Sequence, residues 1–214
     1  MPVPFGRSLA LALAVPVAAA IATAPAIAAP ASAAAELARV QAHLRAVGTM
    51  TADFSQTDAN GKTLTGTLTL KRPGRIRFQY QKGVPLLIVG DGKALTMIDY
   101  QVNQVSRWPV GNSPLSLLLD PSRDIARYVH LVPDAGPGRI VVEGRDPKHP
   151  EFGTITIGFT EAPGAPAGLM LAGWSVVDAQ GGRSTVVLSN QRFGVPVNDR
   201  TFLWRDPRPK THGH

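Results

Sequence analysis

The clearest pattern in the sequence is an alternation of apolar and polar residues in two neighbouring stretches, 63–71 and 75–80. In the first stretch Leu64, Leu68 and Leu70 fall on one face of an extended chain, opposite a row of threonines. In the second stretch isoleucine, phenylalanine and tyrosine alternate with arginine and glutamine. Because a period of two indicates half-buried β-strands, we predict two strands here.

Further short runs of this kind continue along the chain, separated by turns rich in glycine, proline, asparagine and aspartate. The pair Asn60-Gly61 is a strong hairpin signal. Many short strands with local connections indicate an antiparallel sheet, and a sheet of this length tends to curl towards a barrel. The predicted strands cover residues 50–55, 63–71, 75–80, 86–89, 94–100, 105–108, 128–132, 139–143, 154–159, 169–177 and 184–190, and a last extended piece covers 201–204.

A few segments depart from the period of two and predict short helices. Residues 36–47 end before Gly48 and carry apolar residues at spacings of three and four, namely Leu37, Val40, Leu44 and Val47. A helix this short is marginal alone and must dock on something. A second short helix is predicted over 113–119, with Pro114 near its start, and a further helical turn is expected within 120–127.

The first part of the chain has the organisation of a secretory signal. Arg7 precedes an apolar run without charges over residues 9–22. The alternative is a membrane-spanning helix, but Pro16 interrupts the run, which is also short for a bilayer core of about 30 Å.

Small residues with A-x-A spacing follow this run at 26–28 and again at 31–33. Such spacing precedes signal cleavage, so we expect residues 1–33 to be removed by cleavage near Ala33. Residues 34–214 are then expected to form a single domain of an exported protein.

Composition narrows the class of protein. The sequence contains no cysteine, so the exported chain holds no disulfide and has no thiol for a lipid anchor. Lys and Arg number 22 against 15 Asp and Glu, a net charge of +7. The basic residues are spread along the chain without a nucleic-acid-binding motif, so nucleic acid is not an expected partner. The charge fits either a solvated surface or attraction to anionic lipid headgroups or an acidic partner.

Motifs for catalysis, cofactors and metals are missing from the sequence. It has no G-x-S-x-G elbow, phosphate loop or G-x-G-x-x-G motif. The histidines, none of them paired at a helical metal spacing, are His43, His130, His149, His212 and His214. We therefore predict neither a catalytic site nor a metal or cofactor site. A secreted hydrolase that uses His130 or a scattered carboxylate is the less favoured alternative.

One arginine interrupts the apolar face. Arg72 has the same parity as Leu68 and Leu70, so a regular strand directs its side chain to the apolar side. Pro73 follows at once, which ends the strand near a rim. The guanidinium then needs acceptors such as the free carbonyls of a helix end. The alternative is a slip of the pleat that leaves Arg72 solvated, and the pattern alone does not separate the two.

Several short motifs occur together in a family-specific order. They are FSQ at 54–56, GTLTLKRP at 66–73, IRFQY at 76–80, VGDGK at 89–93 and GNSPL at 111–115. In this order and spacing, residues 36–119 resemble the LolA family of outer-membrane lipoprotein carriers, and the C-terminal strands resemble it more loosely.

The resemblance implies a soluble periplasmic chaperone, expected to act as a monomer. Such a protein takes acylated lipoproteins from an inner-membrane ABC transporter and hands them to the outer-membrane receptor LolB. The implied fold is an incomplete antiparallel β-barrel covered by a helical lid, and the family's lid-gating arginine matches Arg72. The expected lid face is Leu37, Val40 and Leu44. The expected lining of the acyl cavity is Leu68, Leu70, Ile76, Phe78, Leu115 and Leu118.

Two stretches depart from the family pattern. Family members carry tryptophan and other aromatics after the Asp-Gly-Lys turn, where this chain reads LTMI at 95–98. The proline-rich loop at 161–168 has no clear family counterpart. The alternative within the same fold is a periplasmic module that binds a free lipid or glycolipid.

Overall fold

The chain divides into two compact units, Met1–Pro30 and Ala31–His214. The computed structural model describes residues 32–110, 115–145 and 153–209, all in the second unit. The predicted signal peptide, residues 1–33, therefore lies outside the described residues except for Ser32 and Ala33. No helix in the described ranges is long and apolar enough to cross a membrane.

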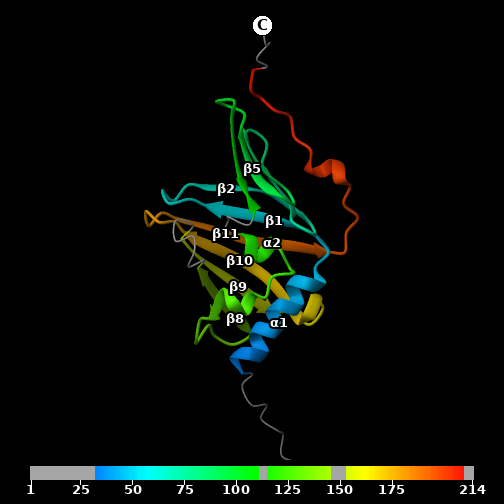
Figure 1. Ribbon diagram of the computed structural model, residues 1–214, viewed down its shortest axis with the longest axis vertical. Helices are drawn as coiled ribbons and strands as arrows, with labels where there is room; N and C mark the ends of the chain where they lie inside the picture. The colour runs from blue at the N-terminus through cyan, green and yellow to red at the C-terminus, as the bar shows by residue number, and fades with distance from the viewer. Residues whose placement is uncertain (1–31, 111–114, 146–152, 210–214) are drawn as a thin grey trace, which may run out of the picture. The chain divides into compact units, whose positions relative to one another are not determined.

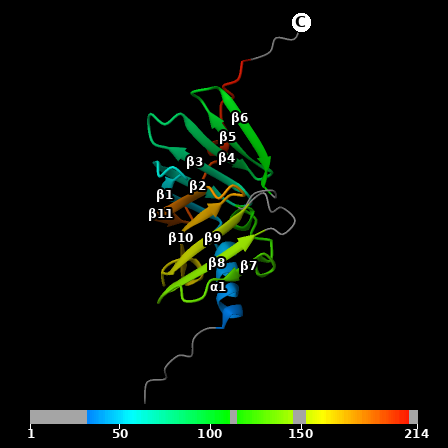
Figure 2. The same ribbon diagram turned by 90° about the vertical axis from the view of Figure 1, so that its left-hand side faces the viewer.

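One antiparallel sheet of 11 strands dominates the second unit, in the order β6-β5-β4-β3-β2-β1-β11-β10-β9-β8-β7 (Figures 1 and 2). The strands are β1 (Thr49–Thr57), β2 (Thr63–Lys71), β3 (Arg75–Tyr80), β4 (Leu86–Asp91), β5 (Ala94–Asp99), β6 (Gln104–Pro109), β7 (Val129–Leu131), β8 (Arg139–Arg145), β9 (Thr154–Glu161), β10 (Leu169–Val177) and β11 (Arg183–Phe193). Strands β6 and β7 are the two edges, so the sheet is open. The predicted mainly β fold with an incomplete antiparallel barrel is confirmed.

The alternation that predicted β2 and β3 accounts for their pairing. Leu68 lies opposite Phe78, and Leu70 lies opposite Ile76. All four side chains are buried, whereas the threonines and arginines between them alternate to the other face. The shared apolar face of the two strands therefore follows directly from the sequence.

The predicted turn at Asn60-Gly61 joins β1 to β2, and an aspartate organises it. The carboxylate of Asp58 accepts hydrogen bonds from the backbone amides of Asn60 and Lys62, both at 2.9 Å. Gly61 has a φ of 80°, which favours glycine over residues with a side chain. The hairpin is thus confirmed, with a loop longer than two residues.

Helix α1 (Ala33–Ala46) begins three residues before the predicted start, because an N-cap precedes its apolar face. The side chain of Ser32 accepts a hydrogen bond from the amide of Ala35 at 3.3 Å. At the other end the amide of Val47 donates to the carbonyl of His43 at 3.1 Å. Small alanines after a serine cap extend a helix, a signal that apolar periodicity alone does not contain.

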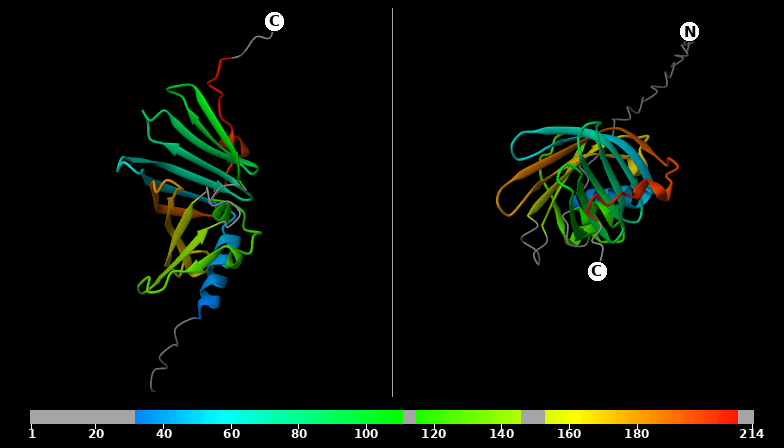
Figure 3. Two further views of the ribbon diagram at one scale, coloured as in Figure 1. Left: turned by 60° about the vertical axis from the view of Figure 1, so that its left-hand side comes forward. Right: turned by 90° about the horizontal axis from the view of Figure 1, so that it is seen from above.

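The other predicted helical segments are shorter than expected. Helix α2 covers Ser116–Leu119, and residues 113 and 114 of the prediction lie outside the described residues. Within 120–127 the structure has a single 3₁₀ turn, η2 (Ile125–Arg127). The side chain of Asp124 caps this turn by accepting a hydrogen bond from the amide of Ala126 at 3.2 Å. Figure 3 shows α1 and α2 on the same side of the sheet, within its curve.

The prediction of an extended segment at 201–204 is wrong for its first half. A 3₁₀ helix, η5 (Asp199–Phe202), forms there because Asn198 caps it by accepting from the amide of Arg200 at 2.9 Å. Local capping of this kind overrides the β propensity of threonine and phenylalanine.

The C-terminal segment, residues 197–204, covers the outer face of β4. This strand carries apolar residues on both faces of the sheet. Leu87, Val89 and Ile98 pack with Phe202 in a small second core. The guanidinium of Arg77 holds this segment in place by donating to two of its carbonyls.

The cap of α1 gives a prediction about the start of the mature chain. A protein that begins at Ala34 lacks Ser32 and places its α-ammonium at the helix N-terminus, where a positive charge is unfavourable. We expect it to be less stable than a protein that begins at Ala29 by about 1 kcal/mol. Urea denaturation of the two purified forms measures the difference, and equal unfolding free energies would contradict the capping role.

Candidate functional site

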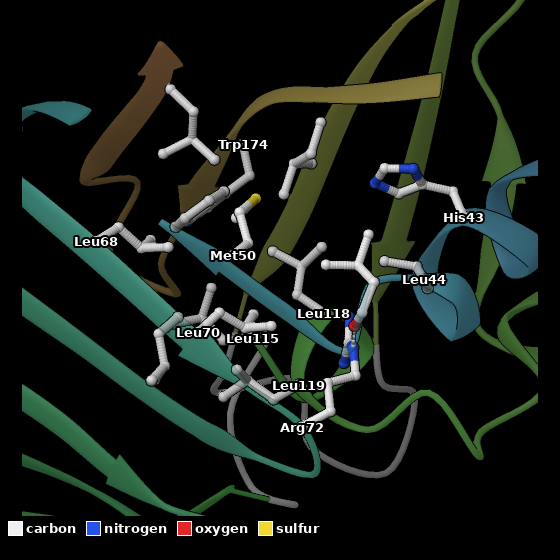
Figure 4. Close-up of a pocket in the computed structure, with 14 residues that line it drawn as sticks. His43, Leu44, Met50, Leu68, Leu70, Arg72, Leu115, Leu118, Leu119 and Trp174 are labelled. Carbon is white, nitrogen blue, oxygen red and sulfur yellow. Dashed lines mark hydrogen bonds between the residues drawn. The ribbon is translucent and has the colours of Figure 1, made fainter. Parts of the chain in front are cut away.

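An apolar cavity lies between the sheet and the two helices (Figure 4). It is lined by His43, Leu44, Val47, Met50, Leu68, Leu70, Arg72, Ile76, Leu115, Leu118, Leu119, Leu171, Trp174 and Leu188. The volume of this cavity that water can occupy is about 20 Å³, room for little more than one water molecule. The side chains therefore nearly fill the cavity in this arrangement.

The sheet supplies one wall of the cavity from strands far apart in the sequence. Leu68, Ile76 and Trp174 come from β2, β3 and β10, and alternation directs each side chain to the inner face. Behind this wall Phe78 packs edge-on against Trp174, with ring centroids 6.1 Å apart. It also packs edge-on against Phe54 at 5.3 Å.

Helix α2 supplies part of the opposite wall. All four of its residues are buried, and Leu118 and Leu119 line the cavity together with Leu115. The carbonyl of Leu119 accepts a hydrogen bond from the amide of Gly74 at 3.2 Å. This bond fixes α2 to the turn between β2 and β3.

Arg72 connects the sheet to the end of α1. Its Nε donates to the carbonyl of Val47 at 3.0 Å, and Val47 is the C-cap of α1. Its backbone amide donates to the carbonyl of Gly48 at 2.8 Å. Figure 4 shows the side chain turned towards the helix. The structure thus places the guanidinium on the apolar side, at a helix end, and not in solvent after a slipped pleat.

The environment of this guanidinium is costly for a cation. Burial lowers the pKa of Arg72 to about 10, although the charge of Asp120 acts in the opposite direction. Arg72 therefore stays protonated at neutral pH. Within the described ranges its Nη1 atom is buried without a hydrogen-bond partner, and an unpaired buried donor costs about 1–3 kcal/mol. The hydrogen bond to Val47 therefore offsets only part of the cost of burying this guanidinium.

Gln41 attaches α1 to the segment after α2. Its amide nitrogen donates to the carbonyl of Pro121 at 3.2 Å, and its amide oxygen accepts from the amide of Ile125 at 3.0 Å. The sequence analysis missed this contact, because a polar residue on a helix gives no sign of its partner.

His43 attaches α1 to the proline-rich loop. It is 2% exposed, lines the cavity, and places Nδ1 2.9 Å from the carbonyl oxygen of Pro166. Burial lowers the pKa of His43. The sequence analysis did not select this residue, yet position 43 is three after Val40 and four before Val47, so helical spacing already puts it on the apolar face.

The structure brings most of the predicted site residues together. On the lid, Val40 and Leu44 are buried and Leu37 is partly buried against the core. Five of the six residues predicted to line the cavity do so, and these are Leu68, Leu70, Ile76, Leu115 and Leu118. Phe78 lies in the core beside the cavity instead, in edge-on contact with Trp174, which does line it.

His130 occupies no catalytic arrangement. Its side chain is 70% exposed on the edge strand β7 and lies 3.7 Å from Glu143 on β8. In the described part of the chain no group of His, Asp and Glu could hold a metal ion. The positions of His149, His212 and His214 lie outside the described residues.

Fold and site together define a class of protein. An open antiparallel sheet, covered by helices over an apolar cavity and held by a few polar contacts, suits reversible binding of an apolar ligand.

The comparisons make the class specific. The family model described as outer membrane lipoprotein carrier protein LolA matches residues 45–204. An outer-membrane lipoprotein carrier protein of Chromobacterium violaceum is 32% identical over 184 residues, covering 82% of this chain and 85% of that protein. One from Nitrosospira multiformis is 30% identical over 138 residues, covering 59% and 66%. A crystal structure of a LolA superfamily protein from Nitrosomonas europaea has a TM-score of 0.46 at 12% identity, covering 82% and 99%.

The chain belongs to the LolA family of outer-membrane lipoprotein carriers. Membership makes it a carrier and not an enzyme, which confirms that part of the sequence analysis.

The packing of the helical wall gives a testable prediction. Leu118 is 5% exposed in the wall of the cavity, so Leu118→Ala is expected to lower the unfolding free energy by about 2–5 kcal/mol. Leu203, which is 68% exposed, provides the matched control. Leu203→Ala should change stability by less than about 0.5 kcal/mol. Urea denaturation compares them, and equal effects would contradict the packing described for α2.

Proposed function

We propose that this protein is a monomeric periplasmic chaperone that carries acylated lipoproteins between the two membranes. It receives them from an inner-membrane ABC transporter and delivers them to an outer-membrane receptor of LolB type. The observation that carries the proposal is the apolar cavity closed over by α1, with Arg72 on the end of that helix.

The lining suits acyl chains. Twelve of the residues that form it are apolar, and only His43 and Arg72 are polar. An acyl chain gains about 0.8 kcal/mol for each CH₂ that leaves water, so such a lining attracts it strongly. A carrier must also release the chain, which a permanently open apolar cavity would resist.

The closed cavity is too narrow for an acyl chain, so one of its walls must move on loading, and we propose that α1 is the wall that moves. Movement of α1 breaks the hydrogen bond between Arg72 and Val47. A hydrogen bond to a charged group contributes about 1.5–3 kcal/mol, and each 1.4 kcal/mol changes an equilibrium about tenfold. The cost of the unpaired Nη1 offsets part of this contribution, so Arg72 favours the closed, empty state by a small net free energy that assists release without preventing loading.

The net positive charge suits a carrier that meets membrane surfaces. The excess of 22 basic over 15 acidic residues favours encounters with anionic surfaces and acidic partners. A free lipid or glycolipid in the same cavity is the alternative occupant. Mass spectrometry of the protein isolated from a periplasmic extract separates the two, because acylated lipoproteins support the carrier and free lipids alone contradict it.

Substitution of Arg72 tests whether its hydrogen bond to Val47 controls the release of cargo. Arg72→Leu removes the hydrogen bond to Val47 and replaces a buried charge by an apolar group, a change that buried sites tolerate. We expect the variant to fold and to accept an acylated lipoprotein, but to deliver it to the receptor at least about tenfold more slowly. A reconstituted handover assay with transporter-containing liposomes measures both steps.

Arg127→Leu is the matched control, because the side chain of Arg127 is 78% exposed. It should accept and deliver cargo as the unmodified protein does. Delivery by Arg72→Leu at the unmodified rate would show that Arg72 does not govern release.

A further inference from the structure

The connection between β9 and β10 is a compact loop that presents a carbonyl to α1. It contains the 3₁₀ turn η4 (Pro166–Gly168). The amide of Ala162 donates to the carbonyl of Gly168, and that of Gly168 donates to the carbonyl of Ala165, both at 2.9 Å. Because the loop is held by its own hydrogen bonds, the carbonyl of Pro166 has a fixed direction.

His43 meets this carbonyl from α1. A carbonyl oxygen can only accept, so at 2.9 Å the Nδ1 atom of His43 carries the hydrogen. The other nitrogen, Nε2, then has no proton in the neutral ring. The ring edge packs against Phe159 and Phe193, with centroids 5.6 Å and 6.2 Å apart.

We propose that His43 holds α1 over the cavity independently of Arg72. The His43 ring keeps the cavity closed while it is neutral and releases the helix when it is protonated. The cavity would thus accept apolar ligands more readily as the pH falls. The use of this switch in lipoprotein transfer rests on the proposed function. The switch itself does not, because it concerns access to the cavity.

Protonation is unfavourable in the closed arrangement for two reasons. The added proton on Nε2 needs an acceptor, and the other side chains that line the cavity are apolar except for Arg72, which is itself a cation. It also adds a second cation to a cavity that Arg72 already lines, and the charge of Arg72 opposes it. The helix end would otherwise favour a cation, but Arg72 already occupies the carbonyl of Val47 there.

The charged groups around His43 do not compensate for this. On α1 itself Arg39 pairs with Glu161 at 3.0 Å. From the end of β2 comes Arg72, whose own charge is offset by Asp120. The groups that favour the charged ring are the backbone of Pro166 and of Leu169. Strands β9 and β11 contribute the neutral rings of Phe159 and Phe193.

The direction of the pH effect follows from linkage. Burial is the largest cause that lowers the pKa of His43 in the closed state, whereas an open state restores a value near the ordinary 6.5. The open state therefore binds more protons. The closed state is fully favoured above pH 6.5, and it loses stability as the pH falls from there to the lowered pKa.

The test measures access to the cavity with 1-N-phenylnaphthylamine, which fluoresces in apolar surroundings and needs no lipoprotein or receptor. We expect the unmodified protein to bind this probe at least about threefold more tightly near pH 5 than near pH 7.5, since one pKa unit corresponds to about tenfold. His43→Gln keeps a side-chain N–H donor but does not titrate, so its probe affinity should not change with pH. His130→Gln, the matched control on an exposed histidine, should keep the full pH dependence.

Three results would overturn the proposal: pH-independent probe binding by the unmodified protein, an unchanged pH dependence in His43→Gln, or its loss in His130→Gln. If His43→Gln does not fold by circular dichroism, an NMR titration of the His43 ring in the unmodified protein replaces it. A pKa at or above the ordinary value would then contradict the proposal. Failure of lipoprotein handover with an intact pH switch would instead count against the proposed function.

Discussion

The structure depends on one constraint, which is that the inner face of an open apolar sheet must be covered by helices that cannot form stably alone. Helix α1 has 14 residues and α2 has only four, lengths that are marginal in isolation. Their stability therefore comes from packing Val40, Leu44 and Leu118 against the sheet. Because helices and sheet need each other, whatever loosens the contact between them exposes both at once.

In the proposed function, this dependence lets polar contacts at the edge of α1 control access to the apolar cavity. Apolar packing has no preferred direction and changes gradually, whereas a hydrogen bond is either made or broken. Arg72 binds the end of α1, Gln41 binds the segment after α2, and His43 binds the proline-rich loop. Each contact joins α1 to a different segment of the chain. In the proposed function these contacts provide the closed state with which an acyl chain competes.

Much of the fold could be predicted from the sequence, because strand alternation is a local property. The positions of β2, β3 and β10 follow from it, and so does the placement of Leu68 and Leu70 on the inner face. The start of α1 and the turn η5 were missed, since both depend on single capping side chains at Ser32 and Asn198. Capping leaves little trace in apolar periodicity.

The candidate site was predictable only in part, for a different reason. Parity left two positions open for Arg72, the apolar side or solvent, and the contact with Val47 that decides between them depends on where α1 ends in space. Phe78 has the correct parity but does not line the cavity, whereas Trp174, which touches it from nearly a hundred positions away in the chain, does. His43 has the spacing of the lid face, and its polar character concealed this. Strand parity assigns a side chain to one face of the sheet, but only the assembled structure decides which of those side chains line the cavity.

The central claim is that α1 leaves the sheet when cargo binds and that Arg72 opposes this movement. The absence of cysteine allows spin labels to be placed at two chosen sites, such as Ala38→Cys on the exposed side of α1 and Thr67→Cys on the outer face of β2. Pulsed electron paramagnetic resonance then measures the distance between them in empty and lipoprotein-loaded protein. We expect a single distance in the empty protein and a clearly different distance in the loaded protein. In empty Arg72→Leu we expect part of the molecules to show the distance of the loaded protein. The same distance in all three samples would contradict the account.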